Sequence, residues 1–218
     1  MPPPDQALAE LAIFPLPDVV LFPGAALPLH VFEPRYVAMT RDVLAGSRLM
    51  AIVRLQPGYQ ADYHGRPPVY RTATVGEVIA SEELPEDRFA IIVRGLDRIV
   101  IERELPPERS YRRVVARVLA DDGADEGALA VERGQLQAMC DQLADRIGEH
   151  GERLRELLRA AAGSTGGLTF AVASSLVGDP DQRQSLLELR SPAERLTRLV
   201  DHTADLLARL GPPRSPAN

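Results

Sequence analysis

The sequence predicts an α+β fold, with a β-sheet or barrel in its first half and a bundle of α-helices in its second. Short apolar runs rich in β-branched residues follow one another from Leu11 to about Leu119. An acidic, glycine-containing segment, Ala120–Gly127, then interrupts the pattern. Beyond it, apolar residues recur every three to four positions, which is the period of an amphipathic helix.

The first half contains a series of short runs that we expect to form strands, because each is bounded by proline or glycine. Four prolines in the early runs confine those strands to edges, bends or bulges, since proline has no N–H to donate to a neighbouring strand. The expected strands are Leu11–Leu16, Val19–Phe22, Leu27–Phe32, Leu49–Leu55, Val69–Ser81, Phe89–Val93, Ile99–Glu102 and Tyr111–Leu119.

One helix is expected to interrupt the strands. Pro34 suits its first position, where a missing backbone N–H costs nothing. Tyr36, Met39 and Val43 then fall on one face of the helix. Gly46 is expected to supply a left-handed cap at its end.

The second half is expected to form helices alone. A glycine-rich segment, 163–167, is expected to be a flexible joint between two of them. Asp179 before Pro180 indicates one helix start, and the Ser191–Glu194 capping box indicates the start of the last helix. We therefore expect a β-domain at residues 8–120, a helical domain at 126–211, and disordered tails at 1–7 and 212–218.

The composition excludes several classes of protein. A net charge of −6 argues against a protein that neutralises phosphates, so no nucleic-acid partner is expected. The single Cys140 cannot form an intramolecular disulfide, which fits a reducing compartment. The chain starts without a secretory signal, and no apolar run approaches the roughly 20 residues that cross a bilayer. We therefore expect a cytoplasmic protein with no membrane partner.

The residues also argue against catalysis. The chain contains no lysine, and all 25 of its basic residues are arginine, which stays protonated and cannot act as a general base. A Ser-Lys dyad and a Walker A lysine are therefore impossible in this chain. No G-x-S-x-G motif surrounds a serine. We expect no enzyme activity, no cofactor and no metal, because metal-ligand spacing is missing among His30, His64, His150 and His202.

The most specific signal is the stretch IFPLPDVVLFPGAALPLHVFEPRY at residues 13–36. Its successive Pro-Leu, Phe-Pro-Gly, Leu-Pro-Leu and Phe-Glu-Pro-Arg-Tyr segments resemble the opening of the N-terminal, substrate-binding domain of Lon proteases. The resemblance covers about residues 11–210. It continues through Thr74-Val75-Gly76 with Ile79, Val93–Arg98, Phe170–Leu176, Gln184–Leu189 and Glu194-Arg195-Leu196.

The resemblance implies a twisted, PUA-like β-domain or pseudo-barrel followed by a helical bundle. In full-length Lon proteases this region gathers unfolded or tagged polypeptides for an ATPase ring and a protease chamber. This chain contains neither the P-loop motif nor the lysines that those activities need. The resemblance therefore implies a non-catalytic module that binds unfolded or extended polypeptide, as an adaptor in proteolysis or protein quality control. A separate protease or chaperone would then be its second partner, and the sequence indicates no oligomeric state.

Two segments are candidate binding sites. The Glu-Pro-Arg-Tyr motif at 33–36 is expected to start a helix and to bury its tyrosine, and the alternative is contact with a bound peptide. The loop at 56–68 carries two tyrosines, and aromatic residues in long loops often serve recognition, although an ordinary hairpin insertion is the alternative. The candidate peptide-binding residues are Phe32, Arg35, Tyr36, Tyr59 and Tyr63.

Two other functions stay open at the level of sequence. An enzyme or small-ligand binder would use the cleft between the two domains, and a convergent polar cluster in a deep pocket would distinguish it. RNA binding would use the arginines between 88 and 117. Acidic residues are interleaved with those arginines, and stacking aromatic residues are sparse, so a mixed solvated surface is the expected role of that region.

Overall fold

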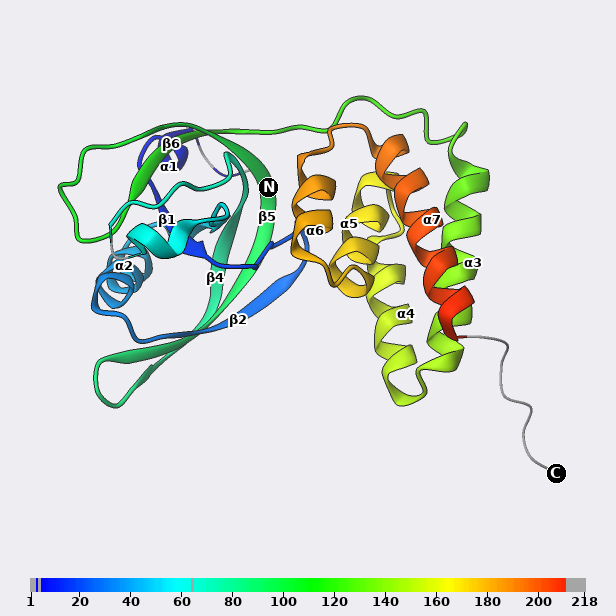
Figure 1. Cartoon of the computed structure of the whole chain (residues 1–218), viewed down its shortest axis with the longest axis horizontal. Helices are drawn as coiled ribbons and strands as arrows, with labels where there is room; N and C mark the ends of the chain where they lie inside the picture. The colour runs from blue at the N-terminus through cyan, green and yellow to red at the C-terminus, as the bar shows by residue number, and fades with distance from the viewer. Residues whose placement is uncertain (1–2, 4, 64, 211–218) are drawn as a thin grey trace. The chain divides into compact units, whose positions relative to one another are not determined.

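The computed structural model describes residues 3, 5–63 and 65–210, and their course is shown in Figure 1. These residues confirm an α+β fold with a six-stranded sheet. The chain divides into two compact units. The first comprises residues 1–120 together with Arg183–Glu188, and the second comprises residues 121–182 and 189–218. A short helix, α1 (Asp5–Leu8), lies near the start, and the tail expected at 212–218 lies outside the described residues.

The sheet of the first unit closes into a barrel. Strand β1 pairs in parallel with β3, and the other neighbouring strands pair antiparallel. Strand β6 pairs with both β1 and the second half of β5, which closes the circle, while β2 pairs with the first half of β5. The strands are β1 (Leu11–Leu16), β2 (Ala26–Val31), β3 (Leu49–Arg54), β4 (Thr72–Leu84), β5 (Arg88–Glu104) and β6 (Arg113–Val118).

Two of the expectations about strands were wrong. The segments expected at Phe89–Val93 and Ile99–Glu102 belong to one long strand, β5, because Gly95 between them continues the pairing with β4. The run Val19–Phe22 is buried but forms no strand. It crosses over β5 so closely that a Cβ at Gly95 would stand 2.3 Å from the Phe22 carbonyl oxygen. Its apolar composition therefore reflects burial and not strand pairing.

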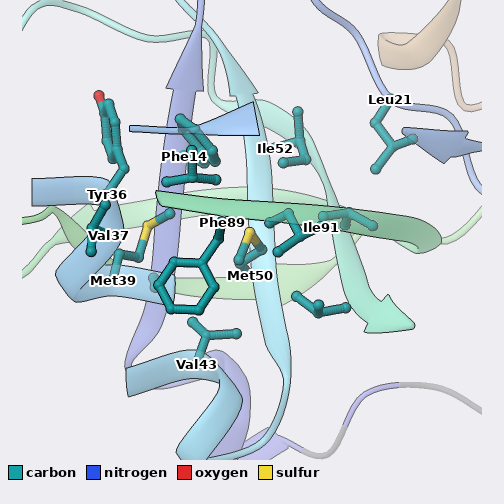
Figure 2. Close-up of a cluster of buried hydrophobic side chains, with 14 residues drawn as sticks. Phe14, Leu21, Tyr36, Val37, Met39, Val43, Met50, Ile52, Phe89 and Ile91 are labelled. Carbon is teal, nitrogen blue, oxygen red and sulfur yellow. The ribbon is translucent and has the colours of Figure 1, made fainter. Parts of the chain in front are cut away.

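Alternate residues of β1 contact two different apolar clusters. Leu11 and Ile13 belong to one cluster, whereas Ala12 and Phe14 belong to another that also contains residues of α2 (Pro34–Ala45). Figure 2 shows the second cluster, with Phe14 among the side chains of α2 and the neighbouring strands. Because successive side chains of a strand point to opposite faces, burial of both faces produces a continuous apolar run in the sequence.

Helix α2 begins at the expected proline, but its end differs from the expectation. Gly46 has a φ of −111° and is not left-handed. The left-handed residue is Arg48, with a φ of 60°, whose N–H donates to the Val43 carbonyl at 2.9 Å. The Arg48 side chain also donates from Nε to the Val78 carbonyl oxygen at 2.9 Å. These two hydrogen bonds stabilise the turn without a glycine in the left-handed position.

Helices are the regular secondary structure of the second unit among its described residues. Half of the predicted capping box is confirmed, since the Glu194 N–H donates to Ser191 Oγ at 3.2 Å, whereas Glu194 Oε1 accepts from Arg198 Nη2 at 2.7 Å. The glycine-rich segment is not a free joint, because Ser164 Oγ accepts the Gly167 N–H at 3.1 Å and caps a helix there. No helix among the described residues is long and apolar enough to cross a membrane. The helices are α3 (Ala130–Arg146), α4 (Glu149–Ala161), α5 (Thr165–Leu176) and α7 (Pro192–Leu210).

Helix α6 (Pro180–Glu188) contributes its last residues to the first unit. Arg98, which is 3% exposed, donates from Nη1 to the Leu187 carbonyl at 2.8 Å. Gln184 Nε2 donates to the carbonyl oxygen of Thr72 on β4 at 3.1 Å. The end of α6 is therefore bound to the barrel by buried polar contacts, which the sequence pattern did not indicate.

Candidate functional site

An open groove of about 590 Å³ lies on the face of β2, β5 and β4 that points away from the apolar clusters. Ala80 and Ala90 contribute only small side chains to the lining, which helps to leave the surface hollow. Pro28 and Ile92 supply larger apolar side chains, and His30 and Glu82 supply polar groups. The strand register arranges the lining side chains in two rows, Pro28–Ile92–Ala80 and His30–Ala90–Glu82.

A β-bulge increases the apolar surface beside this groove. Val78 pairs with Val93 and Ala80 pairs with Ile92, so Ile79 is the extra residue between them. Bulges commonly redirect a side chain, and Ile79 is 45% exposed. Phe32 is 63% exposed, and its ring lies 6.0 Å from that of His30. Exposed large apolar side chains therefore gather around the groove.

The backbone edge beside the groove is poorly suited to binding another strand. Among the described strands, β2 pairs with β5 and forms the edge of the sheet. Along β2 the backbone N–H and C=O groups point alternately towards β5 and towards solvent. Pro28 lacks the N–H that a further strand would need. The side chains of the groove, and not the edge of β2, therefore provide the more suitable surface for a ligand.

Four of the five predicted peptide-binding residues come together around Glu33, the N-cap residue of α2. The Tyr63 hydroxyl donates to Glu33 Oε1 at 3.0 Å, and Arg35 Nη2 lies 3.1 Å from Glu33 Oε2. Arg35 Nη2 also donates to the Tyr63 carbonyl at 3.2 Å. The rings of Tyr59 and Tyr63 lie 6.0 Å apart. The start of α2 and the loop at 56–68 thus form one polar and aromatic cluster, while Phe32 lies beside the groove.

Tyr36 is mainly a core residue, as the sequence indicated. Its ring lies 4.4 Å from that of Phe14, and its side chain reaches the apolar cluster in Figure 2 with the hydroxyl at the margin. Burial, partly offset by the charge of Arg35, raises the pKa of Tyr36 to about 12. Burial and the hydrogen bond to Glu33 also raise the pKa of Tyr63, which is only partly buried. Both tyrosines are therefore neutral donors at physiological pH.

The groove was not predicted from the sequence. Its lining residues come from the consecutive strands β4 and β5 and from β2, which is distant in sequence, and Ala80 and Ala90 have no distinctive chemistry. One weak signal exists in the run Val78–Ala80, which breaks the alternation of apolar and polar residues in β4. Such a break is typical of a bulge, but it does not reveal the neighbouring strands.

The arginines between 88 and 117 do not form a free cationic face. Their guanidinium groups meet carboxylates such as Glu77, Glu104 and Asp42, so much of the positive charge is neutralised locally. Affinity for nucleic acid depends on unneutralised Lys and Arg. Arginines in ion pairs include Arg88, Arg94, Arg109, Arg112, Arg113 and Arg117.

Two further features bear on catalysis. Cys140 is fully buried on α3, and burial raises the pKa of its thiol to about 12, so it is not an activated nucleophile. Among residues 3, 5–63 and 65–210, no group of three or more His, Cys, Asp or Glu side chains is placed to hold a metal ion. His30 is exposed on β2, and His202 Nε2 donates to the Leu176 carbonyl oxygen at 3.2 Å.

A closed barrel with an exposed apolar groove, followed by a helical unit, defines this chain as an α+β protein with the features of a binding domain. Residues 10–205 match the family described as the ATP-dependent protease La (LON) substrate-binding domain, and the chain belongs to that family. It is similar to the Lon N-terminal domain protein of Xanthomonas campestris, with a TM-score of 0.63 and 22% identity over 88% of this chain and 97% of that one.

Other comparisons agree on the family and the fold. The N-terminal domain of Mycobacterium avium complex Lon protease has a TM-score of 0.64 and 20% identity, over 91% of this chain and all (100%) of that one. The Lon protease of Roseiflexus castenholzii is 30% identical over 87% of this chain. That of Trichlorobacter lovleyi is 29% identical over 91%. The chain spans 23% and 24% of the lengths of these two relatives.

Proposed function

We propose that this chain is a non-catalytic module that binds unfolded or extended polypeptide. The observation that supports this most directly is the groove across β2, β5 and β4. It is open, two alanines contribute only small side chains to its lining, and exposed apolar side chains surround it. Contiguous exposed apolar surface on a soluble protein commonly marks a site of protein interaction. The family to which the chain belongs is named for substrate binding, which agrees with this proposal.

The groove suits an extended chain better than a folded surface. It crosses three strands, which are spaced about 4.8 Å apart, so its width is close to that of one peptide with its side chains. The space above the small side chains of Ala80 and Ala90 accepts bulky apolar side chains of the client, and Pro28 and Ile92 at neighbouring positions contact them. Apolar capture of this kind tolerates many sequences, which an unfolded client requires. The cluster of Tyr59 and Tyr63 is proposed as a second contact.

The groove is tested by filling it. Ala80→Trp and Ala90→Trp each place an indole where we propose the client side chains to bind. The control is Ala26→Trp, at an exposed position of β2 outside the groove lining. Binding of reduced, carbamidomethylated α-lactalbumin is measured by fluorescence anisotropy. We expect at least a tenfold loss for the two groove variants and little change for the control. Equal affinities in all three variants would place the client elsewhere.

The tyrosine cluster has its own test. Tyr59→Ala with Tyr63→Ala is expected to weaken client binding by about 1 kcal/mol or more, as for residues that dominate an interface. Binding of this unfolded protein is expected to be about equal at low and moderate salt, because apolar contacts are not screened. A steep loss with salt would instead favour the arginines between 88 and 117. Unchanged affinity in the double variant would restrict the site to the groove.

The adaptor role concerns the partner that receives the client. We propose that a separate protease or chaperone does so, since this chain has no lysine for a P-loop or a Ser-Lys dyad. The purified chain should neither hydrolyse ATP nor degrade casein. A pull-down from native lysate with and without ATP identifies the partner by mass spectrometry. ATPase or protease activity that persists through purification and is lost with a single serine substitution would refute the non-catalytic proposal.

A further inference from the structure

A second, smaller pocket in the first unit is rich in arginine. It has a volume of about 120 Å³, and its lining includes Arg35, Arg66, Arg109 and Arg112. The pocket is smaller than the cavity of about 150 Å³ that holds a benzene molecule, so it suits a group of only a few atoms. Arg35 comes from the start of α2, Arg66 from the loop at 56–68, and the other two from the segment before β6. Four cationic side chains from three separate segments therefore converge on one small volume.

The carboxylates that pair with these arginines do not line the pocket. Arg35 pairs with Glu33 at 3.1 Å, and Arg109 pairs with Asp42 at 3.3 Å. Arg66 lies 2.8 Å from Glu104, which also pairs with Arg112. A fourth carboxylate, Asp62, lies close by and accepts the Arg66 backbone N–H at 3.0 Å. The lining itself contains four guanidinium groups and no carboxylate.

Glu104 is the carboxylate most strongly committed to these arginines. Its partial burial raises the pKa, but hydrogen bonds and charge from Arg112 and Arg66 outweigh that effect and leave the pKa below its ordinary value. Glu104 is therefore ionised at neutral pH while being shared between two cations. Arg112 uses all three of its guanidinium nitrogens on Glu104 and the Pro67 carbonyl oxygen, so the capacity to bind a further anion lies with Arg66 and not with Arg112.

Two of the arginines have donors directed away from their acidic partners. The described contacts of the Arg66 guanidinium all involve Nη2, which reaches Glu104 at 2.8 Å and the Leu105 carbonyl at 3.1 Å. The described contact of Arg109 involves Nη1 alone. Each guanidinium carries five N–H donors in a planar fork, which matches the two oxygens of a carboxylate. Nε and the second terminal nitrogen of each remain for a ligand.

The rest of the lining indicates what the anion is attached to. Pro15, Pro107 and the ring of Tyr36 provide apolar surface, and Ser110 provides a hydroxyl. A free, fully hydrated inorganic ion gains nothing from apolar walls, whereas a carboxylate on a carbon chain contacts both kinds of surface. We propose that this pocket binds a carboxylate of the polypeptide client, from its C-terminus or from an acidic side chain. This inference rests on the proposed polypeptide binding.

The test compares three fluorescein-labelled apolar decapeptides, which differ only in their carboxylates. One has a free C-terminus, one has a C-terminal amide, and one has the amide and a single glutamate. We expect at least one of the two acidic peptides to bind about tenfold more tightly than the neutral amide, a ratio that corresponds to about 1.4 kcal/mol. The acidic peptide that gains identifies the source of the carboxylate. Equal affinities of all three would overturn the inference.

Variants then locate the effect in the pocket. Arg66→Gln with Arg109→Gln should reduce the advantage of the acidic peptides to less than twofold. The control is Arg88→Gln with Arg117→Gln, which removes the same amount of charge. The side chains of Arg88 and Arg117 are 36% and 60% exposed, close to the 37% and 55% of Arg66 and Arg109. The ratio of affinities within each variant is independent of the fraction of protein that folds. An equal loss of the advantage in both pairs would refute the assignment to this pocket.

A third variant tests the pocket without removing an ion pair. Ser110→Asp places a carboxylate in the lining, at an exposed position. It should abolish the advantage of the acidic peptides and preserve the affinity of the neutral one. If the neutral amide binds and the acidic advantage is missing in the unmodified protein, the carboxylate pocket is wrong but polypeptide binding stands. If none of the three peptides binds, the proposed function itself fails.

Discussion

Arg195 on α7 gives the sharpest prediction about stability. Its side chain is fully buried, at 0% exposure, yet it carries a charge. Asp121 meets it with two oxygens, Oδ1 at 2.9 Å from Nη1 and Oδ2 at 2.6 Å from Nη2. The Leu189 carbonyl and Thr169 Oγ1 accept two more of its donors, at 2.6 and 3.2 Å, and the ring of Phe170 lies 4.2 Å away. The charge is therefore compensated by one carboxylate.

Asp121→Ala removes that carboxylate and leaves the guanidinium buried. Loss of one partner from a buried ion pair costs about 3–5 kcal/mol. The Asp121 side chain is 27% exposed, so water can partly replace it, and we expect a loss near the lower limit, about 3 kcal/mol. Domains are commonly stable by about 5–15 kcal/mol, so this change is a large part of the total. Adding Arg195→Met should recover part of the loss, because no uncompensated charge then remains.

The neighbouring residue supplies a matched control. Asp122 pairs with Arg190 at 2.6 Å, but these side chains are 53% and 56% exposed. Exposed pairs contribute about 0–1 kcal/mol, so Asp122→Ala should change stability by less than about 1 kcal/mol. Urea unfolding followed by circular dichroism at 222 nm measures all four proteins. Equal losses for the two aspartate variants would refute the argument that burial of Arg195 determines the cost.

Two further predictions use the raised pKa values. Burial raises the pKa of Tyr36 from 10.0 to about 12, so the folded protein holds this proton more tightly than the unfolded chain does. The difference stabilises the folded state below pH 10, and this contribution is lost as the pH rises towards 12. The loss is at most about 2–3 kcal/mol, and urea midpoints from pH 8 to 11.5 should fall less steeply in Tyr36→Phe. The Cys140 thiol, with a pKa of about 12, should resist alkylation by iodoacetamide at pH 8 in the folded protein and should react in urea. Rapid alkylation of the folded protein would show that α3 opens readily.

Elements whose signals are local could be predicted reliably from the sequence. Pro34 and the Ser191 capping box depend on backbone groups within a few residues, so the helix starts that they indicate appear in the structure. Gly46 shows the limit of this reasoning, because any residue held by enough hydrogen bonds, here Arg48, can take the left-handed position. The run Val19–Phe22 shows another limit, since an apolar composition reports burial and does not distinguish a strand from a buried crossing segment.

By itself, the sequence determined the α+β class, the family resemblance and the exclusion of lysine-dependent chemistry in this chain, because these follow from composition, period and short motifs. The boundary between the expected domains at 120–127 stays a prediction of the same kind. Tertiary structure alone decided the groove and the arginine pocket. Strand register brings Pro28, Ile92 and Ala80 into one row, and chain folding brings Arg35 beside Arg109. Such neighbours are set by long-range pairing and packing, which no local pattern in the sequence encodes.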